Sequence, residues 1–138
     1  MTPSSQATVF RNAMAKIWQE PTSTIIHLKL LDHEYSNYDK AKAVLDDLSL
    51  ISNDSPGLIM VHCLGFGHTS PEVRRLAHFK CIELVEKAAI IVPPRTEFMV
   101  RLMLKPILKF DEVDYQFFSN KEKAEEWLLV NDAQSAAS

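Results

Sequence analysis

The sequence is poor in glycine and cysteine, with three glycines and two cysteines in 138 residues. Two cysteines are too few for the disulfide framework of a small secreted domain, so we expect Cys63 and Cys81 to be reduced and buried. A basic excess is also missing, since the net charge is -3, which argues against a nucleic-acid binder. No apolar run approaches the about 20 residues that cross a bilayer, and residues 1–6 do not resemble a signal peptide. These absences indicate a cytoplasmic globular protein without a membrane span.

The length and the composition predict one domain with a hydrophobic core. Hydrophobic residues make up 46% of the chain and charged residues 24%, which are ordinary values for a globular protein. We place the domain at residues 7–130. The last eight residues, 131–138, contain only Asn, Asp, Gln, Ser and Ala and are expected to form a flexible polar tail.

The spacing of apolar residues predicts an α/β protein. Residues 8–18 indicate one bent strand or two short strands, and residues 24–30 alternate as a strand that completes an antiparallel hairpin. The elements expected after this hairpin are a helix at 38–51, a strand at 58–63, a helix from Ser70 to Val85, a strand at 88–92, a helix at 95–104 ended by Lys105–Pro106, a strand at 113–118, and a short helix at 121–129. This order predicts a mixed sheet of about five strands with four helices.

The loop between the strand at 58–63 and the following helix is the first candidate for a functional site. Ser70 suits the N-cap of this helix, Pro71 its first position and Glu72 its first turn. In α/β proteins, ligands and modifications commonly lie where a strand ends before a helix begins. We therefore assign residues 65–68 (Gly65, Phe66, Gly67 and His68) to a surface for a partner or a ligand.

Four segments carry a resemblance to a known fold: Ala15–Trp18, Ile25–Lys29, Asp39–Leu45 and, above all, Tyr115–Leu128. With the order of elements, they resemble the STAS or anti-sigma-factor-antagonist fold, which CRAL-TRIO lipid-transfer domains partly share. The chain looks most like small uncharacterised bacterial STAS-like proteins, and the resemblance covers residues 9–130. It implies a non-enzymatic module for protein interaction or regulation.

The resemblance also implies a possible phosphorylation site. In antagonist-type STAS domains, a serine or threonine at the start of the helix after the third strand is phosphorylated, which switches binding to a partner kinase. Thr69 and Ser70 occupy that place here. The usual Asp-Ser-Ser-Gly-like run is replaced by His-Thr-Ser-Pro at residues 68–71, and capping alone is a sufficient role for Ser70. The sequence therefore favours the cap and keeps phosphorylation as an alternative.

Metal-binding and catalytic motifs are incomplete. His62, Cys63 and His68 lie within seven residues, but adjacent strand residues point to opposite faces, so His62 and Cys63 do not suit one ion. The remaining histidines are scattered along the sequence, and Cys63 is expected to face the core. The Gly65–Gly67 segment lacks the third glycine and the lysine of nucleotide-binding loops. We predict no catalytic residue, no metal and no cofactor.

The segment from Phe98 to Leu108, which begins within the helix expected at 95–104, is apolar nearly all round. Such a helix is either covered on two sides or exposes an apolar face to a partner. The residues assigned to this possible surface are Phe98, Met99 and Met103. The sequence thus predicts binding to another protein or to a second copy in a homodimer. The alternative is an apolar or lipid-like ligand held between this helix and the sheet, and an enzyme is a third, weaker hypothesis.

Overall fold

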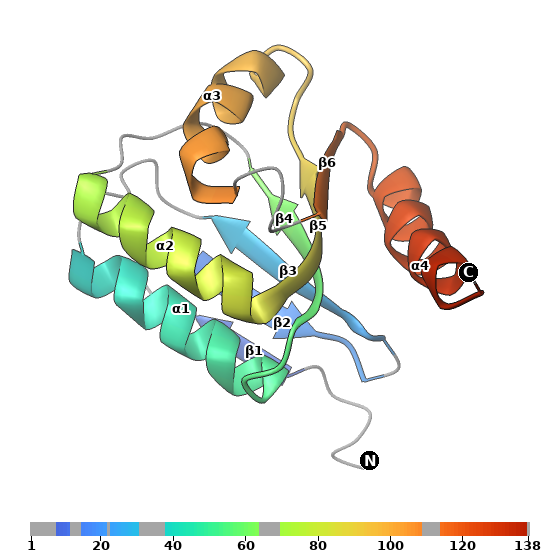
Figure 1. Ribbon diagram of the computed structural model, residues 1–138, viewed down its shortest axis with the longest axis horizontal. Helices are drawn as coiled ribbons and strands as arrows, with labels where there is room; N and C mark the ends of the chain where they lie inside the picture. Colours follow the sequence, from blue (N-terminus) through green and yellow to red (C-terminus); the bar gives the residue numbers. More distant parts are fainter. Residues whose placement is uncertain are drawn as a thin grey trace.

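The computed structural model describes residues 8–11, 15–21, 23–30, 38–63, 70–108 and 114–137. These residues form one six-stranded sheet and four helices (Figure 1). The strands are β1 (Thr8–Arg11), β2 (Ala15–Gln19), β3 (Ile25–Leu30), β4 (Gly57–His62), β5 (Val85–Ile91) and β6 (Asp114–Phe118). The helices are α1 (Tyr38–Ser52), α2 (Pro71–Leu84), α3 (Glu97–Leu108) and α4 (Lys121–Ala137).

The strands lie in the sheet in the order in which they occur along the chain. β2 pairs antiparallel with both β1 and β3, whereas β3 to β6 run parallel. The mixed α/β sheet with an N-terminal hairpin is therefore confirmed. It has six strands because the segment at 8–18 divides into two.

The unreversed strand order decides where the helices lie. Right-handed crossovers that always advance in one direction place their helices on one face of a sheet. Accordingly α1, α2 and α3 lie together on one face, and α4, which follows the last strand, lies on the other (Figure 1). The two faces consequently carry separate cores and separate surfaces.

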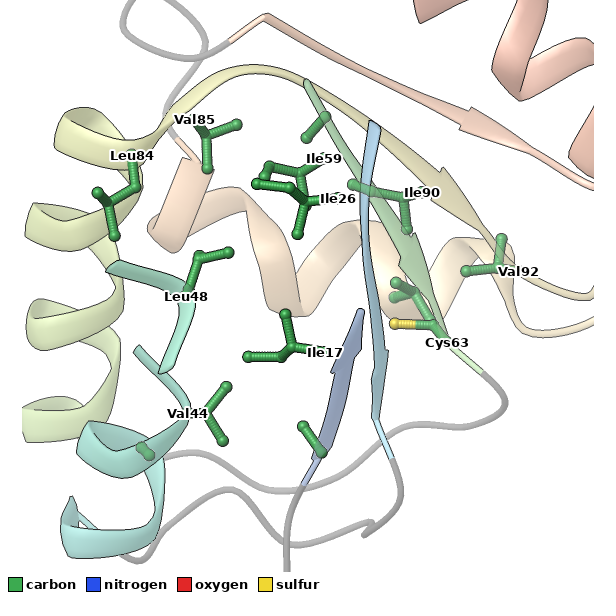
Figure 2. Close-up of a cluster of buried hydrophobic side chains, with 14 of the residues drawn as sticks. Ile17, Ile26, Val44, Leu48, Ile59, Cys63, Leu84, Val85, Ile90 and Val92 are labelled. Atoms are coloured by element: carbon green, nitrogen blue, oxygen red, sulfur yellow. The ribbon is translucent and has the colours of Figure 1, made fainter. Parts of the chain in front are cut away.

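The larger core lies between the sheet and the helices α1, α2 and α3 (Figure 2). Alternate strand positions point into it, among them Ile17, Ile26, Ile59 and Ile90, because neighbouring strand residues face opposite sides. The helices contribute Val44, Leu48, Val73, Leu84 and Val100. The smaller core lies under α4 and contains Ile25, Leu58, Met60, Ala89, Ala124 and Leu128. Strands β4 and β5 are thus covered on both faces, as their apolar runs indicate, and so is β3, whose alternation predicted only one buried face.

The ends of several helices agree with the expected signals. After α1, Asn53 and Asp54 adopt positive φ values of 56°, a conformation that asparagine and aspartate tolerate well. At the start of α4, Asn120 Oδ1 accepts hydrogen bonds from the N–H groups of Glu122 at 2.8 Å and Lys123 at 3.2 Å. Asn120 is therefore the N-cap of α4.

Three predicted boundaries are wrong. Pro106 does not end α3, which continues to Leu108; the missing N–H disturbs only the last turn, since the helix ends two residues later. Val85 is not helical but begins β5 and caps α2. Helix α4 does not end at Leu129 but continues to Ala137, because the alanines and the glutamine of the expected polar tail are compatible with a helix. Among the described residues, no helix is long and apolar enough to span a membrane.

Adjacent leucines on α4 test the smaller core. Leu128 is fully buried, whereas Leu129 is 49% exposed. We expect Leu128→Ala to lower the free energy of unfolding by about 2–5 kcal/mol, because a buried leucine leaves a cavity. Leu129→Ala is the matched control and should change the free energy of unfolding by less than about 1 kcal/mol. Equal effects of the two substitutions in urea denaturation would contradict the packing of α4 on this face.

Candidate functional site

Ser70 caps α2. Its backbone is extended, with φ of -83° and ψ of 159°, and its hydroxyl oxygen accepts a hydrogen bond from the Val73 N–H at 3.3 Å. Its carbonyl accepts from the Arg74 N–H at 3.0 Å, and Pro71 follows as the first helical residue. The predicted cap is confirmed. The other residues assigned to this loop, Gly65, Phe66, Gly67, His68 and Thr69, lie outside the described residues, so their role stays a prediction.

The outer face of α3 is apolar and open. Phe98, Met99 and Leu102 expose 69%, 53% and 56% of their surface, whereas Val100 is fully buried. Residues 98 and 102 are one helical turn apart, so the three side chains share one face of the helix. We call Phe98, Met99 and Leu102 the α3 strip. Met103, the third residue assigned from the sequence, has a side chain outside the described part.

α3 contacts the sheet through the buried Val100 and through Arg101, whose side chain lies beside the α3 strip. Arg101 forms an ion pair with Glu97 at 3.1 Å, and its guanidinium lies 4.4 Å from the ring centroid of Phe117 on β6. A cation over an aromatic face is favourable. The buried Val100 and the contact of Arg101 with Phe117 thus face the sheet, while the α3 strip faces outward.

A second cluster lies on the other face of the sheet and joins Trp18 on β2, His27 on β3 and His62 on β4. His27 is paired with Trp18 across the antiparallel ladder and with Met60 across the parallel one. His62 lies two residues after Met60 and therefore on the same face. His27 Nδ1 and His62 Nε2 are 3.1 Å apart, within hydrogen-bond distance, so that one nitrogen donates and the other accepts. We call these three residues the Trp–His cluster.

The indole of Trp18 covers both imidazoles. Its centroid lies 4.8 Å from that of His27 with the rings 7° from parallel, and 5.6 Å from that of His62 with an angle of 21°. The Lys16 ammonium lies 5.1 Å from the Trp18 ring centroid. His27 is only 2% exposed. The two imidazoles are therefore held edge to edge beneath one indole.

The surroundings keep both imidazoles neutral. Burial lowers the pKa of His62 from 6.5 to about 4, and the positive charges of His27, Lys121 and Lys29 add to this effect. Burial, followed by the charge of Lys121, also lowers the pKa of His27, although Glu20 and Glu125 act in the opposite direction. Two imidazolium ions so close together would also repel each other.

Cys63 follows His62 but lies on the opposite face, in the larger core. Burial raises the pKa of its thiol to about 11, so the thiol stays protonated and a poor nucleophile near neutral pH. The expected separation of His62 from Cys63 is confirmed. Within the described ranges, no group of three His, Cys, Asp or Glu side chains could hold a metal ion.

The pairing of His27 with His62 is not evident from the sequence, in which the two residues lie 35 positions apart. Alternation within the strand at 24–30 does place His27 and Lys29 on one face, which was the available signal. The pairing itself depends on the register of β3 against β4, and periodicity does not determine the register between two strands.

The family model described as "Domain of unknown function (DUF7793)" matches residues 17–130. The chain belongs to this family. The match covers β2 from residue 17 onward, β3 to β6, all of α1, α2 and α3, and α4 as far as residue 130. No curated protein matches the chain significantly.

The chain is similar in structure to an uncharacterized protein of the DUF3478 family from Shewanella loihica PV-4. That protein is described as having a SpoIIAA-like fold. The TM-score is 0.57 at 13% sequence identity, and the similarity covers 89% of this chain and 92% of that chain. At this identity the likeness shows the fold alone. The expected STAS-like fold is thereby confirmed.

Substitution of Ser70 tests the cap. Ser70→Ala should lower the free energy of unfolding by about 0.5–2 kcal/mol, because the Val73 N–H loses its acceptor. Ser70→Asp should keep the wild-type value, since aspartate is an equally good N-cap. Urea denaturation followed by circular dichroism measures both, and a fully stable alanine variant would contradict the capping role.

The pH dependence of stability tests the Trp–His cluster. The pKa of His62 is about 4 in the folded state and about 6.5 when unfolded, so the unfolded chain binds more protons between these values. Stability should therefore fall as the pH drops from 6.5 towards 4, and this loss is absent above pH 6.5. His62→Gln should reduce the slope of melting temperature against pH in this window. His78→Gln, on the opposite face of the sheet, should keep the wild-type slope; identical slopes in all three proteins would refute the neutral pair.

Proposed function

We propose that this protein is a non-enzymatic STAS-like interaction module that uses the α3 strip to bind another protein, in the first place a second copy of itself. The observation that carries this proposal is the exposure of Phe98, Met99 and Leu102 on one helix face. Exposed apolar patches commonly mark interaction sites.

Burial of the α3 strip against a partner would be energetically favourable. Burying one large apolar side chain contributes about 1.5–3 kcal/mol, so three adjacent side chains represent a substantial driving force for association. Aromatic residues and methionine are enriched in interfaces, and the flexible thioether of Met99 can adapt to a partner. Other exposed apolar side chains in the same helix layer are Leu50 on α1 and Phe79 and Ile82 on α2.

The chemistry of the candidate nucleophiles supports a role without catalysis. The Cys63 thiol lies in the core with a raised pKa, and the Ser70 hydroxyl accepts the capping hydrogen bond. Both cysteines are free thiols, which agrees with the cytoplasmic location that forms part of this proposal.

The alternative of an apolar ligand between α3 and the sheet has weaker support. Val100 on the inner side of α3 is fully buried and belongs to the same packed cluster as Val92 and Phe117. Protein side chains therefore already contact one another where such a ligand would lie. Native mass spectrometry of protein purified from its own host would reveal a retained ligand, together with any bound phosphate at Thr69 or Ser70.

A switch at the start of α2 would act on the proposed interaction. Phosphate at a helix N-terminus is favourable and adds up to about two negative charges. We infer that Ser70 acts as a cap only, so Ser70→Asp should leave partner binding unchanged. A loss of binding with an unchanged melting transition would instead favour phosphorylation of Thr69 or Ser70.

Sedimentation equilibrium tests the α3 strip. We expect the wild-type protein to form a dimer and Phe98→Asp to be monomeric with an unchanged circular dichroism spectrum, because a buried carboxylate without a partner opposes association. Leu50→Asp, at a side chain on α1 that is 64% exposed, is the matched control and should remain dimeric. A monomeric wild-type protein would rule out the homodimer. Equal loss of the dimer in both variants would refute the assignment to α3.

A further inference from the structure

We propose that the sheet face beside α4 binds an inorganic oligophosphate, a chain of three or more linked phosphates, through a row of cations on β1, β2 and β3. This inference is independent of the proposed protein interaction, because the α3 strip belongs to the opposite face of the sheet. It rests on the register between the strands, on the charges that this register brings together and on the shape of the face.

The register places three cations side by side. Arg11 on β1 pairs with Lys16 on β2, and Lys16 pairs with Lys29 on β3. Directly opposite residues point to the same face of a sheet, and this is the face of Trp18, because Lys16 lies two residues before Trp18 on the same strand. Arg11 is exposed, and Lys16 and Lys29 are partly exposed. We call Arg11, Lys16 and Lys29 the basic row.

The charge of the basic row is not balanced by ion pairs. Like charges directly opposite each other destabilise a sheet, and both cross-strand pairs in the row are of this kind. Among the described residues, no carboxylate forms an ion pair with any member of the row. Glu20 and Glu125 act on the neighbouring His27 without pairing with the row. A bound anion would therefore relieve a repulsion that the fold itself leaves in place.

The positive charge extends to the start of α4. Lys29 pairs with His62 in the parallel ladder. Burial and the charge of His27, followed by the charges of Lys121 and Lys29, lower the pKa of His62, so both ammonium groups lie near this imidazole. Lys121 is exposed, and it also has no ion pair within the described ranges. Four cations from four elements thus border one region near the carboxyl ends of β3 and β4, where ligands of α/β proteins commonly lie.

The dimensions of the basic row favour linked phosphates over an acidic peptide. Adjacent strands lie about 4.7–4.9 Å apart, so the backbones that carry Arg11 and Lys29 are about 10 Å apart. An extended peptide presents the side chains of one face about 6.4–6.8 Å apart and would place only two carboxylates over this length. The phosphates of a triphosphate are joined through shared oxygens, so at least three negative charges fit there. Arginine and lysine both bind phosphate well.

Two features of this face disfavour larger polyanions. α4 packs over β4, β5 and β6 and projects from the sheet (Figure 1). Because a helix is about 10 Å thick, a flat anionic bilayer would meet α4 before it met the row. Single-stranded nucleic acid binds through aromatic rings on which its bases stack, but the Trp18 ring already stacks on His27 and His62 and lies beneath the Lys16 ammonium. A short phosphate chain needs neither a flat surface nor a free ring.

Isothermal titration calorimetry of the full chain with inorganic triphosphate tests the basic row. We expect one equivalent to bind, and inorganic phosphate to bind far more weakly because it contacts fewer cations. Lys16→Gln/Lys29→Gln should weaken triphosphate binding by at least about ten-fold, since hydrogen bonds with charged groups are the stronger class. Wild-type protein that binds no triphosphate, or that binds both anions equally, would overturn the proposal.

The matched control removes the same charge from the other face of the sheet. Lys42→Gln/Lys80→Gln lies on α1 and α2 and should bind triphosphate like the wild type. Both double variants should keep the wild-type circular dichroism spectrum. Equal weakening in the two would mean that only the net charge matters, and the site would be refuted.

Competing probes test the choice of ligand. Triphosphate should bind more tightly than hexaglutamate, a single-stranded oligouridylate or vesicles that contain phosphatidylglycerol. ATP should bind no more tightly than triphosphate, because the Trp18 ring is already occupied by its neighbours. Preferential binding of the peptide, the oligonucleotide or the vesicles would overturn the proposal, and a clear preference for ATP would overturn the assignment to an inorganic chain.

NMR of the wild-type protein requires no variant to fold. Addition of triphosphate should shift the backbone amide resonances of the basic row and the indole N–H resonance of Trp18. The amide resonances of Lys42 and Lys80 should stay unchanged. Triphosphate binding that leaves the resonances of the basic row unshifted would refute the site.

Discussion

The parallel pairing of β3 with β4 is the contact on which the rest of the structure depends. It joins the N-terminal antiparallel hairpin to the parallel half of the sheet. In one register it brings Ile26 beside Ile59 in the larger core and His27 beside Met60 on the opposite face. A slip of one residue would exchange the two faces and place an imidazole among the isoleucines. The burial of Ile26 and Ile59 therefore also positions the Trp–His cluster.

The strand order separates two candidate surfaces. Because each crossover advances in the same direction, α1, α2 and α3 share one face (Figure 1). The α3 strip belongs to the outside of that layer, where exposed apolar side chains favour association. The Trp–His cluster lies on the other face, where burial and, secondarily, neighbouring lysines lower the pKa of both imidazoles. Substitutions at one surface should therefore act independently of those at the other, as is usual for distant sites without shared partners.

Membership in a family of unknown function and a distant SpoIIAA-like neighbour agree on the fold. Neither the family nor the fold specifies a function, so the function has to be inferred from the side chains of this protein. The cap at Ser70 illustrates this need. The same residue position that the resemblance connects with phosphorylation has a complete structural role here, since its hydroxyl and its carbonyl accept hydrogen bonds from Val73 and Arg74.

The sequence by itself determined the fold class, the hairpin, the order of the elements and the cap at Ser70. These features depend on local periodicity and on side chains that bond to their own neighbouring backbone. Only the tertiary structure decided which side of α3 is exposed, because an apolar helix carries no periodic sign of its buried face. It also decided that His27 meets His62, 35 residues apart. That contact requires the register between two strands, which is selected by the packing of both sheet faces at once.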